Sequence, residues 1–185
     1  MDLNQNSFPL MINQMVSNKD KQAIRMSFHT NLEKWRSYLK TENCPICKND
    51  PMPEGMEDVF ELEYTWLNAE PKECIYGACH VIAKKHAIEI YDLSDKELLG
   101  FMKEVALYAK ALKEVTNAIK INYEIHGNTI PHLHVHLYPR YIDDPHANRP
   151  IDTYNKNDQV YSEGEYENFI QKLKQTISEL NTKKD

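Results

Sequence analysis

Three of the eight histidines of this chain, His132, His134 and His136, stand at every second position. Leu133 and Val135 lie between them, and this alternation has the period of a β-strand. One face of the strand is then apolar, and the other carries imidazoles about 6.6 Å apart. A neutral imidazole can act as a nucleophile, and a neighbouring imidazole can donate a proton or a hydrogen bond. The pattern therefore indicates nucleophilic and acid–base chemistry or metal binding.

Two other interpretations of the three histidines compete with catalysis. A metal ion could bind one adjacent pair, but His132 and His136 would be about 13 Å apart along a strand, which strains ligation of one ion by all three. The histidines could also be the solvent-facing side of an edge strand. Their internal position and their alternation with strand-forming apolar residues favour a functional role.

The stretch from His132 to Tyr138 resembles the His-φ-His-φ-His-φ-φ motif of the histidine triad (HIT) superfamily of nucleotide hydrolases and transferases. The resemblance extends upstream through Asn122–Thr129 and downstream to Pro139-Arg140. It implies an α+β, HIT-like fold with about five antiparallel strands and one long helix, assembled as a homodimer. We expect a HIT core domain at residues 44–142, an N-terminal arm with an accessory helix at 1–43, and a C-terminal loop and helix at 143–185 that packs on the core or on a dimer partner.

The resemblance also assigns roles to individual residues. It implies that His134 attacks the α-phosphorus and forms a nucleotidyl-histidine intermediate that water hydrolyses, and that His136 donates to the phosphate oxygens and the leaving-group side. The implied substrate-binding residues are Asn122, Gly127, Asn128 and Thr129. Asn128 could equally be a turn residue that adopts a left-handed conformation beside Gly127. Arg140 is a possible further cation.

A Cys-x-x-Cys pair at Cys44 and Cys47 is half of a tetrahedral zinc site. The alternative is a redox dithiol, but the prolines that follow do not fit the helix that such a motif requires. The resemblance to zinc-containing HIT proteins and to hexose-phosphate uridylyltransferases implies that His86 and His132 complete the site, although Ala83 stands where many relatives have proline. A closed four-ligand site predicts structural Zn²⁺ that orients His134, with no catalytic metal required.

The composition limits the class of ligand. Lys and Arg number 22 against 28 Asp and Glu, which gives a net charge of −6, so we expect no nucleic acid polymer as partner. No run of about 18 apolar residues is present, and the first residues lack a signal-peptide pattern, so we expect no membrane association and a cytoplasmic location. The expected partner is a small-molecule nucleotide.

Hydrophobic periodicity predicts the elements that must position these residues. Ser94 and Glu97 form a capping box, which predicts the start of the long helix. The expected elements are a helix from about Asp20 to Leu39, strands at Val59–Leu67 and Cys74–Ala83, the long helix to about Asn117, strands at Lys120–Ile125 and at the three histidines, and a helix from about Glu165 to Leu180.

These observations together predict an enzyme, a hydrolase that acts at the α-phosphate of a nucleoside phosphoramidate, a dinucleoside polyphosphate or a nucleotidyl conjugate. The uridylyltransferases carry glutamine at the position of His136, so the histidine here favours hydrolysis over transfer. Three alternatives stay open: a nucleotide-binding or regulatory HIT protein with little turnover, a nucleotidyltransferase, and a metal-dependent hydrolase that uses a His-x-His pair with carboxylates. The last is disfavoured because the motif contains no Asp or Glu.

Overall fold

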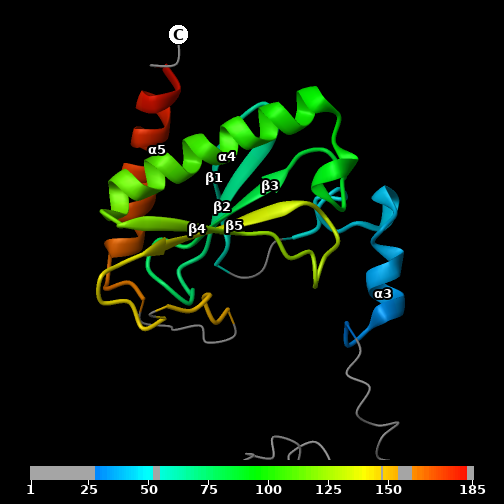
Figure 1. The fold of residues 1–185 in the computed structure, drawn as a ribbon, viewed down its shortest axis with the longest axis horizontal. Coiled ribbons are helices and arrows are strands. Elements are labelled where there is room, and N and C mark those ends of the chain that lie inside the picture. Colours follow the sequence, from blue (N-terminus) through cyan, green and yellow to red (C-terminus); the bar gives the residue numbers. More distant parts are fainter. Residues whose placement is uncertain (1–27, 52–54, 147, 154–159, 183–185) are drawn as a thin grey trace, which may run out of the picture.

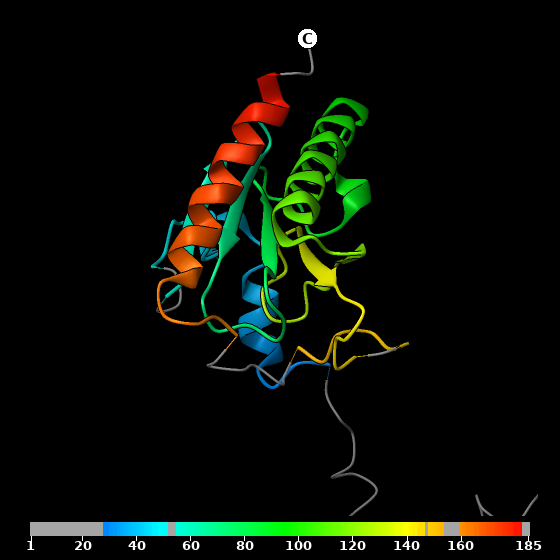
Figure 2. The same cartoon turned by 90° about the vertical axis from the view of Figure 1, so that its left-hand side faces the viewer.

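A computed structural model describes residues 28–51, 55–146, 148–153 and 160–182. Its centre is a five-stranded antiparallel sheet in the order β1-β2-β3-β5-β4, which confirms the predicted α+β class. The strands are β1 (Glu57–Glu61), β2 (Thr65–Ala69), β3 (Cys79–Ala83), β4 (Lys120–Glu124) and β5 (His134–Arg140). Helices α4 and α5 lie beside each other against the sheet, whereas the short helix α3 lies at the opposite end (Figure 1, Figure 2).

Helix α4 (Asp95–Thr116) spans the sheet and supplies much of the core. The Ser94 side chain accepts from the Glu97 backbone N–H, and the Glu97 carboxylate accepts from the Ser94 N–H, so the predicted capping box is present. Phe101, Tyr108 and Leu112 are at most 1 % exposed on the face that meets the sheet. The helix ends at Asn117, whose φ of +54° is the left-handed conformation common at helix C-termini.

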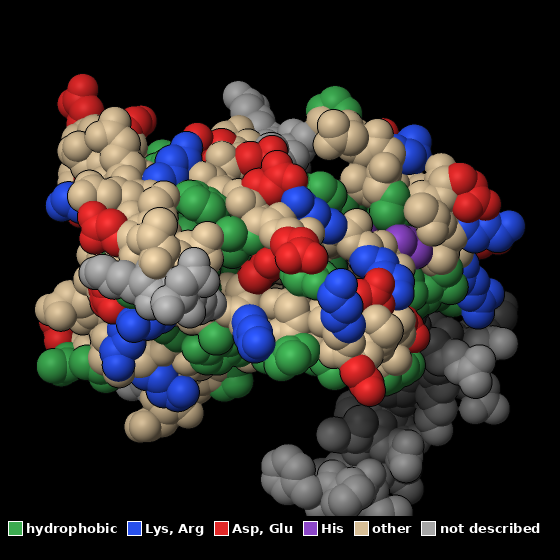
Figure 3. Space-filling model, turned by 90° about the horizontal axis from the view of Figure 1, so that it is seen from above, with side chains coloured by type: hydrophobic (Ala, Val, Ile, Leu, Met, Phe, Trp, Pro, Cys, Tyr) green, Lys and Arg blue, Asp and Glu red, His purple; other side chains and the backbone are tan. Residues whose placement is uncertain are grey.

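Helix α5 (Glu165–Thr182) packs beside α4 in the same chain. Its apolar stripe joins the hydrophobic cluster of the sheet through Phe169, Leu173 and Ile177, all at most 2 % exposed. The predicted C-terminal helix is therefore confirmed. Seen from above α4, lysine and arginine side chains alternate with aspartate and glutamate, and no continuous basic surface covers that face (Figure 3). None of the helices in the described ranges is both long and apolar enough to cross a bilayer.

The prediction of a single strand at Val59–Leu67 is wrong, because the chain reverses direction within this range and forms two strands. β1 ends at Glu61 and β2 begins at Thr65. The reversal is held by α4: the Glu104 carboxylate accepts from the Tyr64 backbone N–H and, at 2.7 Å, from the Thr65 hydroxyl. This tertiary partner leaves no mark on the local hydrophobic pattern.

Two further predicted elements are shorter in the structure. β3 begins at Cys79, and the residues from Cys74 to Ala78 form a buried irregular connection instead of a strand. The accessory helix α3 (Leu32–Ser37) begins after Asn31, whose side chain accepts from the Lys34 backbone N–H and so caps the helix. The earlier part of the predicted helix, from Asp20 to residue 27, lies outside the described residues.

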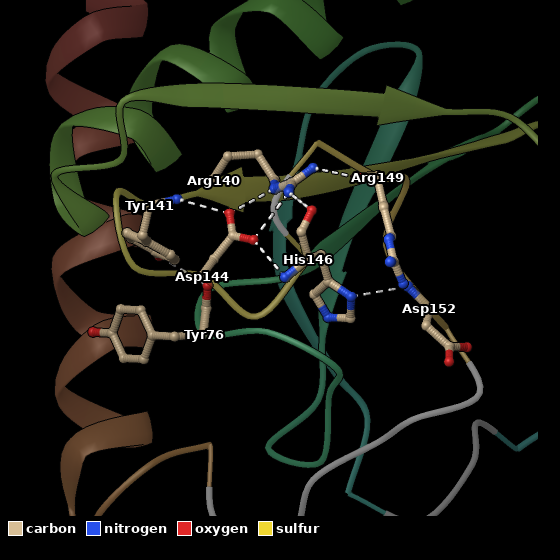
Figure 4. Close-up of polar contacts among 7 residues, drawn as sticks. All are labelled: Tyr76, Arg140, Tyr141, Asp144, His146, Arg149 and Asp152. Atoms are coloured by element: carbon tan, nitrogen blue, oxygen red, sulfur yellow. Dashed lines mark hydrogen bonds and ion pairs between the residues drawn. The ribbon is translucent and has the colours of Figure 1, made fainter.

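Arg140, at the end of β5, anchors the segment that follows the strand (Figure 4). Its guanidinium donates to both carboxylate oxygens of Asp144, at 2.8 and 2.9 Å, and to the backbone carbonyls of His146 and Arg149. Asp144 also accepts from the backbone N–H of Tyr141. These hydrogen bonds, first of all those from Arg140, lower the pKa of Asp144 to about 2. Arg140 is therefore an anchor for this segment, and its charge is already paired.

We predict that Arg140→Lys lowers the free energy of unfolding at pH 7 by about 1–3 kcal/mol, because an ammonium cannot make the two parallel hydrogen bonds. The folded-state pKa of Asp144 is depressed from 3.8 to about 2. The stabilisation is thus complete above pH 3.8 and is lost as the pH falls towards 2. Urea denaturation at pH 7 and at acid pH measures the difference in the free energy of unfolding between wild type and Arg140→Lys, with a substitution of the exposed Lys110, Lys110→Arg, as control. An equal difference at both pH values would contradict the pairing.

Candidate functional site

The three histidines of the motif do not share one strand face as predicted. β5 begins at His134, so His134 and His136 lie on the strand and His132 precedes it. The His132 backbone N–H donates to the Ile130 carbonyl at 2.8 Å, which turns the chain before the strand starts. His132 is 0 % exposed. Its side chain is therefore directed into a different cluster from the other two.

That cluster contains the four residues predicted as metal ligands. The ligand atoms of Cys44, Cys47, His86 and His132 all lie within 4.8 Å of one another. The Cys44 sulfur is 3.4 Å from Nδ1 of His132, and the Cys47 sulfur is 3.2 Å from Nδ1 of His86. Two thiols and two imidazoles at this spacing match a tetrahedral S₂N₂ donor set.

Backbone carbonyls set the protonation of both imidazoles in this cluster. Nε2 of His132 lies 2.7 Å from the Ala83 carbonyl, and Nε2 of His86 lies 3.1 Å from the Leu39 carbonyl. A carbonyl only accepts, so each Nε2 carries the proton and each Nδ1 presents a lone pair to the sulfurs. Burial lowers the pKa of His132 to about 4, which keeps this ring neutral. Neutral imidazoles with free Nδ1 lone pairs are the form that ligates a metal.

The two thiols of this cluster also indicate a metal site. Burial, followed by the hydrogen bond and the charge of Cys44, raises the pKa of Cys47 to about 11. Two adjacent thiolates repel each other unless a cation lies between them, and a divalent metal supplies that charge. The donor set therefore fits a metal ion.

Backbone hydrogen bonds position the two segments that carry the cysteines and His86. After the 3₁₀ turn η1 (Thr41–Asn43), the Cys44 N–H donates to the Lys40 carbonyl and the Lys48 N–H donates to the Cys44 carbonyl. At the last residue of β3, the Ala83 N–H donates to the Leu133 carbonyl at 3.0 Å. A proline at position 83 has no such donor. The alanine that replaces the proline of many relatives therefore makes a backbone hydrogen bond at this position, and His86 still reaches the cluster.

His134 has one ring nitrogen fixed and the other available. Its Nδ1 lies 2.7 Å from the backbone carbonyl of His132, so Nδ1 carries the proton and donates. The lone pair is consequently on Nε2. Burial lowers the pKa of His134, which favours this neutral form. The ring is a neutral imidazole with an oriented nucleophilic nitrogen.

His136 lies at the centre of an aromatic cluster. The Tyr138 hydroxyl is 3.1 Å from its Nδ1, and the two rings are stacked at 5.7 Å. The ring centroids of His134, His80 and His126 lie 4.9, 4.7 and 5.2 Å away. Burial, and then the charges of these histidines, lower the pKa of His136 to about 2. His136 is thus neutral at pH 7.

Sequence reasoning assigned no role to His80 or His126. His80 lies on β3 opposite His136, and His126 lies in the connection from β4 to β5. The sequence did carry one signal for His80, since it alternates with the buried Cys79 and Val81 and so points to the other face of the strand. The contact between His80 and His136 could not be predicted, because the two residues are far apart in the sequence.

The four predicted substrate-binding residues lie in β4 and in the connection that follows it. Gly127 has a φ of +65°, and its carbonyl accepts from the Trp35 indole N–H at 3.0 Å. Asn128 and Thr129 follow with exposed side chains. Asn128 is not left-handed, so the turn role considered for it is wrong, since Gly127 supplies that conformation. The Trp35 side chain of helix α3 therefore fixes this turn.

Asn122 is half-buried on β4 and pairs in register with Tyr138, so it projects from the same face of the sheet as His136. It lines an open hollow of about 810 Å³ that runs along β4 to the segment after β5. Lys120, His126 and Arg149 line the same hollow, so it is rich in groups that bind anions. His126 belongs both to this hollow and to the ring cluster around His136. The hollow is thereby connected to the histidines of β5.

Comparison with known proteins gives consistent matches. A family profile described as the HIT domain matches residues 60–143. An uncharacterised HIT-like protein of Methanocaldococcus jannaschii is 30% identical over 109 residues, which cover 55% of this chain and 81% of that protein. The asymmetrical bis(5'-nucleosyl)-tetraphosphatase of Schizosaccharomyces pombe is 29% identical over 116 residues, covering 60% and 59%. A crystal structure of a histidine triad protein from Bradyrhizobium japonicum superposes with a TM-score of 0.60 at 28% identity, covering 67% of this chain and 92% of that one.

The buried neutral His136 predicts a pH-dependent stability. Its folded-state pKa is depressed from 6.5 to about 2, so below pH 6.5 the unfolded chain binds a proton that the folded chain does not. This ring therefore opposes folding increasingly as the pH falls, by up to about 1.4 kcal/mol per pH unit. We expect His136→Gln to make the free energy of unfolding fall less steeply between pH 6.5 and 5, as measured by urea denaturation. His29→Gln, which removes an imidazole outside the site, is the control. An unchanged slope in His136→Gln would show that the ring is not held neutral.

Proposed function

The chain belongs to the histidine triad (HIT) family, and we propose that it is a hydrolase that cleaves a nucleotide at its α-phosphate. The substrate class is a nucleoside phosphoramidate, a dinucleoside polyphosphate or a nucleotidyl conjugate, and one product is a nucleoside monophosphate. The similarity to a dinucleoside tetraphosphatase supports this proposal. In our proposal residues 44–142 form the catalytic core, and residues 1–43 and 143–185 are extensions of it.

The observation that carries the proposal is the orientation of His134. Nucleophilic catalysis needs a nitrogen lone pair held in one direction, and the 2.7 Å hydrogen bond to the His132 carbonyl provides it. Nε2 of His134 attacks the α-phosphorus, the N–P bond forms, and the bond from phosphorus to the leaving atom breaks. Water then attacks the same phosphorus, the N–P bond breaks, and His134 is regenerated with release of the monophosphate.

His136 and Tyr138 complete the phosphate site in this proposal. Burial raises the pKa of Tyr138, so the phenol keeps its proton. The hydroxyl donates a hydrogen bond to Nδ1 of His136. Nε2 of His136 then carries a hydrogen that donates to a phosphate oxygen. A preformed donor of this kind stabilises the charge that develops during transfer. Asn128, Thr129 and the backbone at Gly127 supply further donors, and Asn122 contacts the ribose or a phosphate.

We propose in addition that Cys44, Cys47, His86 and His132 hold structural Zn²⁺. The S₂N₂ donor set and the carbonyl-bound Nε2 atoms support zinc over harder cations, which prefer oxygen ligands. Four protein ligands leave no open position, so the ion would join the Cys44–Cys47 turn to the start of β5. The chemistry at phosphorus then belongs to the histidines alone.

We expect removal of zinc by a strong chelator to lower the melting temperature by about 10 °C and to leave the rate of the chemical step largely intact, because the metal contributes to stability by linkage. Cys47→Ser should lose bound zinc, measured by elemental analysis, whereas Cys74→Ser should retain one ion per chain. Loss of turnover after mild chelation, before any loss of stability, would show that the metal takes part in the reaction.

A homodimer is the assembly that we propose from the family. β4 is an edge strand of the sheet, and Ile119, Tyr123 and Ile125 along it are 48 to 58 % exposed. Large apolar side chains at an unpaired strand edge favour association with a second chain.

The experiment that tests the function is rapid-quench mass spectrometry of the intact protein with adenosine and guanosine phosphoramidates and dinucleoside polyphosphates. We expect wild type to gain the mass of one nucleotidyl group and to release monophosphate. His134→Ala should show neither, with a loss of turnover of at least about 10³-fold. His29→Ala serves as a control at a histidine outside the site. Nucleotide binding without an adduct or product across the panel would instead support a nucleotide-binding protein with little turnover.

A further inference from the structure

His80 occupies a position in the site that its sequence context does not reveal. It pairs in register with His136 across β3 and β5, and residues opposite each other in a sheet project from the same face. The two rings are perpendicular, with centroids 4.7 Å apart. The charge of His80 also contributes to the lowered pKa values of both His134 and His136. His80 is therefore a third imidazole on the face that carries the proposed nucleophile.

A buried carboxylate lies directly behind His80. Oε1 of Glu73 is 3.3 Å from Nε2 of His80, and only 3 % of the Glu73 side chain and 12 % of the His80 side chain are exposed. The other carboxylate oxygen of Glu73 accepts from the Cys74 backbone N–H at 3.1 Å. A carboxylate buried to this extent needs hydrogen bonds and a cation to be stable. An imidazolium at His80 meets that need.

The reaction requires an acid for the leaving atom, and the Nε2 hydrogen of His136 is already assigned to a phosphate oxygen. The leaving oxygen or nitrogen must be protonated as its bond to phosphorus breaks. The Nδ1 proton of His134 is directed at a carbonyl, and the buried ring of His136 is neutral. Three cations adjacent in sequence to site residues are paired with carboxylates: Arg140 with Asp144, Lys84 with Glu61, and Lys85 with Glu97.

A second carboxylate–histidine pair lies on the other side of His136. Nε2 of His126 is 2.9 Å from the Glu124 carboxylate, and its ring centroid is 5.2 Å from that of His136. The His126 side chain is 38 % exposed, more than three times the fraction for His80. Water screens an exposed pair and can replace its proton, so the buried pair is the one that can retain a proton for use in the site.

We propose that His80, held as an imidazolium by Glu73, is the general acid that protonates the leaving atom. This inference rests on the proposed function. As Nε2 of His134 forms its bond to phosphorus, the leaving atom takes the bond electrons and the Nδ1 proton of His80, and His80 becomes neutral while its Nε2 proton stays directed at Glu73. In the second step His80 accepts a proton from the attacking water, and the imidazolium is restored. Protons and electrons balance over the cycle without any other reactant.

The groups that face His80 come from three elements. Glu73 lies in the connection before β3 and favours the charged ring. His134 and His136 on β5 oppose a second positive charge, and His126, which lies beyond His136, lowers the pKa of the same two rings. Among these groups Glu73 is the carboxylate within ion-pair distance of His80, so it is the anion that can stabilise a charged ring.

The test uses a series of aryl esters of AMP and GMP, from p-nitrophenyl to phenyl to p-methoxyphenyl. A p-nitrophenolate leaves without protonation, whereas a phenolate or p-methoxyphenolate needs an acid. We expect His80→Asn to lower kcat/KM for the phenyl and p-methoxyphenyl esters by about 10²-fold or more, and for the p-nitrophenyl ester by less than about fivefold. A purely structural role would lower all three rates equally, and that result would overturn the proposal.

Glu73→Gln provides the second variant, because it keeps the shape of the side chain and removes its charge. We expect Glu73→Gln to lower kcat/KM for the phenyl and p-methoxyphenyl esters by more than for the p-nitrophenyl ester, as in His80→Asn, because the imidazole loses the carboxylate that pairs with it. An equal loss of rate for all three esters in Glu73→Gln would contradict the role of the pair.

His126→Asn distinguishes the two carboxylate–histidine pairs. We expect its loss of rate to be independent of the leaving group. A leaving-group-dependent loss in His126→Asn and not in His80→Asn would assign the acid to the exposed pair and overturn the proposal. The nucleotidyl adduct on wild type distinguishes failure of the proposed function from failure of the role of His80. If wild type forms no adduct, the proposed function fails, whereas an adduct with uniform rate losses in His80→Asn removes only the role of His80.

Discussion

The hydrogen bond from Nδ1 of His134 to the backbone carbonyl of His132 joins the two halves of the site. The same His132 directs its side chain towards Cys44 and Cys47 and donates from Nε2 to Ala83. One residue therefore positions the cysteine cluster with its ring and the proposed nucleophile with its main chain. This division is possible because β5 begins after His132, which frees its side chain from the face of the strand.

The N-terminal segment contributes directly to this arrangement. The Leu39 carbonyl fixes the tautomer of His86, and the Trp35 indole donates to the carbonyl of Gly127 in the proposed phosphate-binding turn. Both contacts join residues that are far apart in the sequence. The accessory helix α3 is therefore part of the support of the site, and its effect reaches both the cysteine cluster and the turn that precedes the histidines.

Features with a local cause could be predicted from the sequence, and features with a tertiary cause could not. The capping box at Ser94 and the apolar stripes of α4 and α5 depend on neighbouring residues and were predicted correctly. The reversal between β1 and β2 depends on Glu104, which lies on another element. The departure of His132 from the strand depends on the cysteines that it meets. His80 acquires its neighbours only through the register of β3 with β5, which periodicity alone does not define.

The contact between Trp35 and Gly127 also gives the protein an internal optical probe. The chain has only two tryptophans, Trp35 beside this turn and Trp66 within β2. Indole emission is sensitive to the hydrogen bond made by its N–H and to nearby water, so the Trp35 signal follows the state of the turn while that of Trp66 follows the sheet. With Trp66 replaced by phenylalanine, Trp35 is the single tryptophan of the chain, and its emission reports on the turn without any added label.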